Sequence, residues 1–177
     1  MAAVERDDRG LLRKAVIAVP AIVIAGSLIG YASNSGFGNA WFDRLTKPSF
    51  MPAGWVFGVV WTTLYTMLGI ALATVLNEPP SKRRSTAVAL FAVQLALNFA
   101  WSPTFFGGAM IDAALVTILV MLALASATAV AFARLRPLAG ALMLPYLAWL
   151  CLATALNYEI GRLNPGADSA PLGITGA

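Results

Sequence analysis

The chain has 177 residues, of which 59% are hydrophobic and 11% are charged. Soluble domains have about 25% charged residues, so this composition, with a mean hydropathy of +0.78, excludes an ordinary soluble domain and indicates a membrane protein. The sequence contains no histidine, which removes the commonest metal and haem ligand and the commonest general base.

Five segments are apolar enough to cross a bilayer, which takes roughly 20 residues for about 30 Å of hydrocarbon. Only helices of this length satisfy their own backbone inside lipid, so the sequence predicts an all-α, five-transmembrane-helix bundle in residues 15–162. Residues 1–14 are expected to form a basic N-terminal tail and residues 163–177 a flexible C-terminal tail. The predicted spans are residues 15–33, 55–76, 86–106, 111–133 and 138–160.

The first span has an alternative interpretation as a cleaved signal peptide, because basic residues precede it and small residues lie near Ala32. Its apolar run is long for a signal peptide. Gly26 and Gly30 also form a G-x-x-x-G pair of the kind that packs transmembrane helices together. We therefore expect a membrane-spanning helix.

The first connection, residues 34–54, is long and rich in aromatic residues and prolines. Trp41 and Trp55 are suited to the level of the lipid headgroups, and Pro48 and Pro52 stiffen the chain between them. Two interpretations remain at this point. The connection is either a loop with interfacial aromatic residues or a lid over a flat, apolar ligand.

The polar residues deep inside the spans are uncharged, and tryptophans lie among them. Asp112 and Glu159 lie only at span ends, which argues against proton pumps and ion-coupled transporters. Gln94, Asn98 and Ser102 recur at four-residue spacing on one face of the third span. That face predicts either hydrogen bonds between helices or polar contacts in a binding cavity.

Aromatic residues also gather on single faces of two other spans. Trp61 and Tyr65 lie one turn apart in the second span, and Trp149 lies one turn before Ala153 in the fifth. Both tryptophans lie several residues inside their spans, where a headgroup-level belt does not explain them. The fourth span is rich in alanine, which predicts close helix packing, with a dimer interface as the alternative.

The distribution of basic residues predicts the orientation. Of the 12 Lys and Arg residues, only Arg44, Lys47 and Arg162 fall on the side opposite the N-terminus. The positive-inside rule therefore places the N-terminus in the cytoplasm. Bacterial inner and outer membranes are not distinguished by this rule.

Three stretches of the sequence, "WFDRLTKPSFMPAGWVF", "QLALNFAWSPTFF" and "LPYLAWLCLATALNYEIGRLN", closely resemble the TspO/MBR family (tryptophan-rich sensory proteins, translocator proteins and peripheral-type benzodiazepine receptors). The resemblance implies five helices around a pocket that opens toward the first connection, which covers it as a lid. It also implies binding of porphyrins such as protoporphyrin IX and haem, isoquinoline or benzodiazepine ligands, and in animal members cholesterol. Homodimers are usual in the family.

The resemblance also implies particular binding residues. The ligand-binding residues it places in this chain are Trp41, Phe42, Pro48, Pro52, Trp61, Tyr65, Asn98, Trp101, Ser102, Trp149, Ala153 and Leu156. A sterol-recognition segment of the form L-x-Y-x-x-x-R aligns on Leu156, Tyr158 and Arg162. The chain departs from the family pattern at Phe42, Phe50 and Ala53, which weakens any detailed ligand preference.

A porphyrin is a flat apolar ring with carboxylates at one edge, so its site needs aromatic walls, a few amide donors and cations at the mouth. Asn98 is the expected donor, and Arg44 and Lys47 are candidates to meet the carboxylates, unless they are simply solvated. No metal site or required cofactor is expected. Without histidine, metal-free porphyrin is expected to bind as well as haem.

These observations favour a membrane receptor or sensor that binds porphyrins and affects tetrapyrrole transport or turnover. One alternative is a light-dependent porphyrin-degrading enzyme that uses Trp61 and Trp149. Another is a facilitated porphyrin or sterol transporter, although the sequence shows no nucleotide site and no charged residues within the spans to supply energy.

Overall fold

The computed structural model describes residues 8–175. Five helical segments in this range are long and apolar enough to cross a membrane, which confirms the predicted all-α fold. The elements, in chain order, are α1 (Asp8–Ala32), α2 (Ala40–Arg44), α3 (Gly54–Leu76), α4 (Lys82–Ser102), the π-helix η1 (Pro103–Gly107), α5 (Ile111–Leu135), α6 (Pro137–Ala141) and α7 (Leu144–Leu163).

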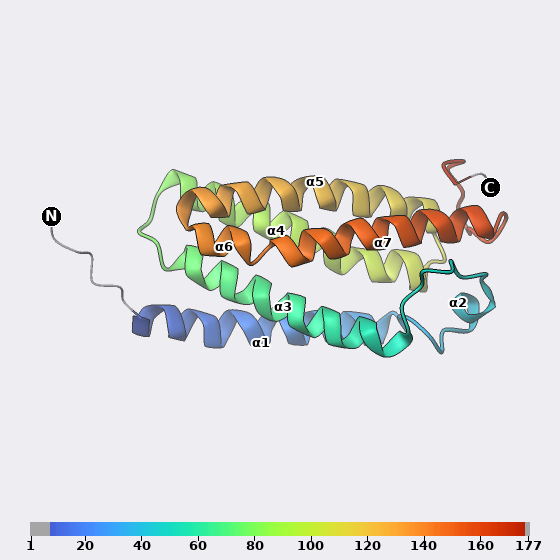
Figure 1. Cartoon of the computed structure of the whole chain (residues 1–177), viewed down its shortest axis with the longest axis horizontal. Helices are drawn as coiled ribbons and strands as arrows, with labels where there is room; N and C mark the ends of the chain where they lie inside the picture. Colours follow the sequence, from blue (N-terminus) through green and yellow to red (C-terminus); the bar gives the residue numbers. More distant parts are fainter. Residues whose placement is uncertain (1–7, 176–177) are drawn as a thin grey trace, which may run out of the picture.

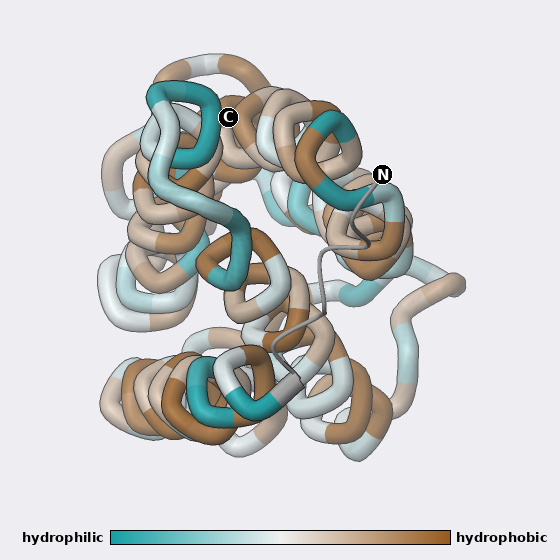
Figure 2. Tube along the Cα trace, turned by 90° about the vertical axis from the view of Figure 1, so that its left-hand side faces the viewer, coloured by the Kyte–Doolittle hydropathy of each residue, from teal (hydrophilic) through white to brown (hydrophobic). Residues whose placement is uncertain are grey.

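The helices form two groups. Figure 1 shows α1 beside α3 along one side of the molecule and α4, α5 and α7 together on the other. Figure 2 views the end at which α1 begins, where hydrophilic segments gather over the largely hydrophobic helices. These segments include the connection between α3 and α4, in which Glu78 forms an ion pair with Arg136.

Several helix boundaries differ from the sequence prediction. The helix α4 begins at Lys82 rather than at residue 86, its span ends in the π-helix η1, and α5 continues to Leu135. The expected N-terminal tail, residues 1–14, is too long, because α1 begins at Asp8; residues 1–7 lie outside the described part. The last predicted span is two helices, α6 and α7, separated at Leu142 and Met143. Each helix has a proline in its first turn, Pro137 in α6 and Pro145 in α7, as expected of a residue that lacks an N–H.

The close approach of α1 to α3 depends on glycine. A Cβ atom on Gly69 would lie 2.7 Å from the Cα atom of Val19, and one on Gly26 would lie 2.2 Å from the ring of Tyr65. Gly26 therefore has the packing role predicted for it. Gly30 does not, because nothing lies within 4 Å of the position of its Cβ.

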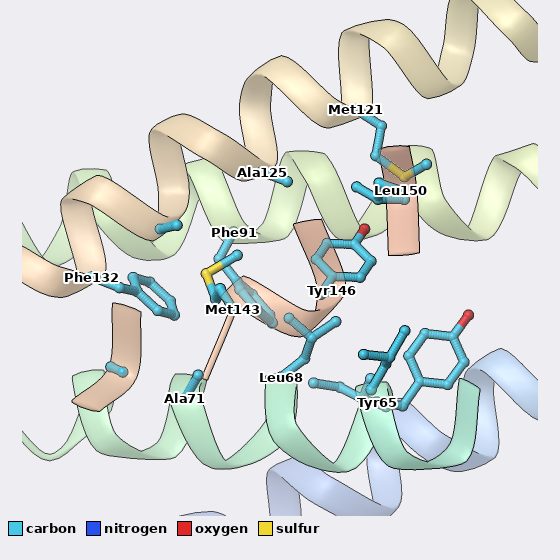
Figure 3. Packing of buried hydrophobic residues seen from close by; sticks show 14 of the residues in the cluster. Tyr65, Leu68, Ala71, Phe91, Met121, Ala125, Phe132, Met143, Tyr146 and Leu150 are labelled. Carbon is cyan, nitrogen blue, oxygen red and sulfur yellow. The ribbon is translucent and has the colours of Figure 1, made fainter. Parts of the chain in front are cut away.

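The larger apolar cluster lies toward the half of the bundle away from the first loop, which we define as residues 33–53, and a smaller buried cluster packs that loop against η1, α5 and α7. Figure 3 shows buried side chains from facing helices meeting in the larger cluster, including Leu68 of α3 and Met143 before α7. Phe91 and Phe132 stack with their ring centroids 5.5 Å apart. This packed half holds the helices in position around a hollow in the other half.

The C-terminal segment is docked, which corrects the expectation of a flexible tail for its described part. Asp112, at the start of α5, is fully buried and accepts hydrogen bonds from the backbone of Leu172 and Ile174 and from the hydroxyl of Thr175. In return, Asp168 accepts a hydrogen bond of 2.7 Å from the backbone N–H of Asp112, which caps the beginning of α5. We call residues 164–175 the C-terminal strap.

The α1–α3 contact should be sensitive to a single methyl group. In Gly69→Ala the new Cβ meets the backbone of Val19, which cannot yield as a flexible side chain does. We expect a loss of about 1–3 kcal/mol in stability, the usual cost of overpacking, measured as a lower thermal midpoint in detergent micelles. Gly58→Ala, on the same helix but facing open space, is the control. Equal midpoints for the two variants would contradict this account.

Candidate functional site

A cavity of about 480 Å³ lies at the end of the bundle nearest the first loop. This volume is within the range of roughly 300–1,000 Å³ that is usual for small-molecule sites. Its lining comes from α1, α3, α4, η1, α5, α7 and the first loop. Glycines of α1 and α3, among them Gly30 and Gly58, face the cavity and leave it space, and aromatic residues from several of the elements line the rest.

Aromatic side chains make up two of the cavity walls. Trp61 of α3 lies with its ring centroid 5.1 Å from that of Tyr65 and 6.5 Å from that of Trp149. On a second wall, Trp101 of α4 stacks on Phe105 of η1 with ring centroids 4.9 Å apart. Rings in these arrangements are attractive to one another and present flat apolar faces to a ligand.

The polar floor of the cavity joins three helices. The Tyr65 hydroxyl donates to Asn98 Oδ1 at 2.8 Å, and Asn98 Nδ2 donates to the Tyr146 hydroxyl at 3.2 Å. The Tyr146 hydroxyl donates to Gln94 Oε1 at 2.9 Å. The predicted polar face of α4 therefore makes hydrogen bonds between helices, and at Asn98 and Ser102 it also lines the cavity.

The structure brings together most of the ligand-binding residues expected from the sequence. Those that line the cavity are Phe42, Trp61, Tyr65, Asn98, Trp101, Ser102, Trp149, Ala153 and Leu156. Trp41, Pro48 and Pro52 do not line it. The indole N–H of Trp41 instead donates to the backbone of Ala167 at 3.3 Å, and Pro48 is buried within the loop.

Several residues at the site were missed by sequence reasoning. Phe37 and Met51 of the first loop line the cavity, as does Asn157 of α7, whose side chain accepts from the Trp101 indole at 3.2 Å. Tyr146 takes part in the polar floor. Its position three residues before Trp149, on the same helical face, was the available signal.

The first loop is tied to the C-terminal strap. Asn164 Oδ1 accepts from the backbone N–H of Thr46 at 2.7 Å, and Asn164 Nδ2 donates to the Thr46 carbonyl at 2.9 Å. Within the loop, Asn39 caps α2 by accepting from the backbone N–H groups of Trp41 and Phe42. These bonds hold Phe42 over the end of the cavity, edge-on to Phe106 with ring centroids 5.2 Å apart.

The two basic residues of the first loop do not line the cavity. Lys47 Nζ donates to the carbonyls of Phe42 and Leu45 and lies 4.6 Å from the centroid of the Phe42 ring. A cation at this position also suits the C-terminal end of α2. Arg44 is exposed and bonds to the Ala40 carbonyl at 2.9 Å. In this state Lys47 holds the loop together, and neither side chain points to the ligand space.

The proposed sterol-recognition residues point in different directions. Leu156 is buried and lines the cavity, whereas Tyr158 is exposed on the outer surface of α7. Arg162 is also exposed and pairs with Glu159, with an Nε–Oε2 distance of 2.9 Å. Leu156 therefore faces the cavity, whereas Tyr158 and Arg162 lie on the exposed surface of α7.

Comparison with known proteins identifies related sequences. Residues 16–163 match the sequence model of the TspO/MBR family. The chain is 41% identical over 143 residues to the translocator protein of Homo sapiens, covering 80% of this chain and 85% of that protein. It is 42% identical over 124 residues to the tryptophan-rich sensory protein of Cereibacter sphaeroides, covering 70% and 77%, and 37% identical over 128 residues to protein CrtK of Rhodobacter capsulatus, covering 72% and 80%. The matched region contains every cavity-lining residue, and the C-terminal strap lies beyond it.

The bonds between Asn164 and Thr46 should limit opening of the first loop. In Asn164→Ala both bonds are lost, and each is worth about 0.5–1.5 kcal/mol. We expect amide hydrogens of the loop around Thr46 to exchange at least about five-fold faster, measured by hydrogen–deuterium exchange mass spectrometry. Glu159→Gln, which removes an exposed ion pair at the same end of α7, should leave exchange in the loop unchanged. Equal rates in Asn164→Ala and the unaltered protein would contradict the prediction.

Proposed function

The chain belongs to the TspO/MBR family of multi-pass membrane proteins, and from that premise we propose that it is a membrane receptor or sensor that binds porphyrins and related flat hydrophobic ligands in the aromatic cavity. Through this binding it affects the transport or turnover of tetrapyrroles. The ligand enters between the two aromatic walls with its ring against Trp61 and Trp101.

The observation that supports this proposal most directly is the combination of flat aromatic walls with a small polar floor. Aromatic faces favour a planar conjugated ring, and the few polar groups on the floor fix its orientation. The relatives' names, "tryptophan-rich sensory protein" and "translocator protein", agree with a sensory or ligand-handling role. On the predicted orientation, the cavity lies toward the side opposite the cytoplasm.

Binding is tested by titrating the detergent-purified protein with protoporphyrin IX in the dark and following tryptophan fluorescence. We expect saturable quenching that is weaker in Trp61→Phe, because Trp61 lines the cavity. Trp55→Phe is the control, since that side chain is 72% exposed and does not line the cavity. Haem should bind with comparable affinity, because the chain contains no histidine to ligate its iron. Absence of saturable quenching would refute the proposed function.

We also propose that the first loop acts as a lid. Phe42 covers the cavity, while Trp41 and Pro48 fix the loop from outside it. In the double variant Trp41→Ala, Pro48→Ala the loop loses both its bond to Ala167 and its stiffness. The dissociation rate of protoporphyrin IX, measured by stopped-flow displacement, should then rise. A rate equal to that of the unaltered protein would show that the loop does not retain the ligand.

A second function, light-dependent porphyrin breakdown, is favoured by the arrangement of Trp61 and Trp149. Both line the cavity, and their ring centroids are 6.5 Å apart, so a bound pigment would touch two oxidisable indoles. If the protein has this activity, illumination should bleach bound protoporphyrin, and Trp61→Phe, Trp149→Phe should abolish bleaching while binding persists. Stable pigment absorbance in the unaltered protein under light would leave only the receptor function.

A further inference from the structure

The polar floor of the cavity continues into the core as a single line of hydrogen bonds. Tyr65 and Asn98 line the cavity, whereas Tyr146 and Gln94 lie behind them and do not. Both rear residues are fully buried, with 0% of their surface exposed. Figure 3 shows Tyr65 on α3 and Tyr146 on α7 among the apolar side chains of the core.

The line ends in an unused donor. In the arrangement described above each bond donates in the same direction, from Tyr65 through Asn98 and Tyr146 to Gln94. The Gln94 side-chain nitrogen Nε2 is buried and, among the described residues, has no hydrogen-bond partner. A buried N–H group without a partner is uncommon and costly.

The same four side chains can be bonded in the opposite direction. The two ends of a side-chain amide have nearly the same shape, so Gln94 and Asn98 can each turn over in the space they occupy. Gln94 Nε2 then donates to Tyr146, Tyr146 to Asn98 Oδ1, and Asn98 Nδ2 to Tyr65. This direction keeps the same number of bonds within the line. It uses the Gln94 nitrogen but leaves the Gln94 carbonyl oxygen without a partner in its place, and it frees the Tyr65 hydroxyl hydrogen to turn toward the cavity.

The two directions present different chemistry to a ligand. In the first, the Tyr65 hydroxyl uses its hydrogen on Asn98 and offers the cavity only an acceptor oxygen. In the second, it offers a donor. We propose that Gln94 and Tyr146, without touching the ligand, act as positioning residues that let the floor accept from a ligand alcohol or donate to a ligand carbonyl.

This inference rests on the proposed porphyrin-binding function and defines the ligand class further. Besides protoporphyrin IX, the site accepts flat apolar rings whose buried edge carries either a hydroxyl or a carbonyl substituent. Replacing Gln94 by methionine, which has a similar volume, removes the acceptor at the rear end. The Tyr146 hydroxyl then donates to Asn98, and Asn98 donates to Tyr65. The line is thereby fixed in the second direction, in which the Tyr65 hydroxyl donates to the ligand.

The experiment compares two porphyrins that differ only at two ring positions, one carrying 1-hydroxyethyl groups and the other acetyl groups. Dissociation constants are measured in the dark by fluorescence quenching. In the unaltered protein both porphyrins should bind with similar affinity. In Gln94→Met the ratio should move about five-fold in favour of the acetyl porphyrin. The Tyr65 hydroxyl then donates to the ligand carbonyl, whereas its oxygen already accepts from Asn98 and is a poorer acceptor for the alcohol hydrogen.

A variant of the intermediate residue tests whether the effect travels along the line. Tyr146→Phe removes the hydroxyl that connects Gln94 to Asn98. Adding Gln94→Met to this variant should therefore leave the affinity ratio unchanged. Such non-additivity shows that the two residues are coupled. Met143→Leu, a buried core change outside the cavity, is the packing control and should leave the ratio unchanged. If Gln94→Met does not fold, Gln94→Leu serves the same purpose.

Two results would overturn the inference while leaving the proposed function intact. One is an unchanged affinity ratio in Gln94→Met, including an equal loss for both porphyrins, which is the result of a purely structural role. The other is a changed ratio that persists in the Tyr146→Phe background. If neither substituted porphyrin binds while protoporphyrin IX does, this inference also fails and the proposed function stands. If protoporphyrin IX does not bind the unaltered protein either, the proposed function fails and this inference fails with it.

Discussion

Polar groups inside this bundle have only one another as partners, because lipid hydrocarbon offers none. That constraint explains the contacts between Tyr65, Asn98, Tyr146 and Gln94, which join α3, α4 and α7. It also explains why these side chains lie at the boundary between the packed half of the bundle and the hollow half. The bonds fix three helices around the cavity and at the same time supply part of its polar surface.

The end of the molecule near the first loop has a different constraint, because the bundle encloses a cavity there. A cavity large enough for a small molecule costs packing energy, so the elements around it must be held by other means. Asp112 and Asp168 fasten the C-terminal strap to the start of α5, and Asn164 fastens the strap to the first loop. The strap thus links the part of the chain that covers the cavity to the part that forms its wall. Hydrogen bonds at the rim and the buried apolar cluster beneath the first loop together hold the elements around the cavity.

Close approach of α1 to α3 provides the third support. Gly69 lets the backbone of Val19 come into contact, and Gly26 leaves room for the Tyr65 ring. The ring position of Tyr65 in turn sets its hydroxyl beside Asn98 and its face beside Trp61. A packing feature of the peripheral helix α1 therefore determines the geometry of both the aromatic wall and the polar floor.

Much of this protein was determined by its sequence alone. The length and apolar character of five segments fixed the all-α membrane fold, since hydrocarbon permits few alternatives at those lengths. Four-residue spacing placed Trp61 with Tyr65 and Gln94 with Asn98 on common faces, because the helical period is local. Only the tertiary structure decided the remainder. The turning of Trp41 away from the cavity, the use of Lys47 within its own loop and the docking of the C-terminal strap on Asp112 depend on contacts between residues distant in sequence. Periodicity carries no information about such contacts, because it describes which side of a helix a residue faces and not what lies across from it.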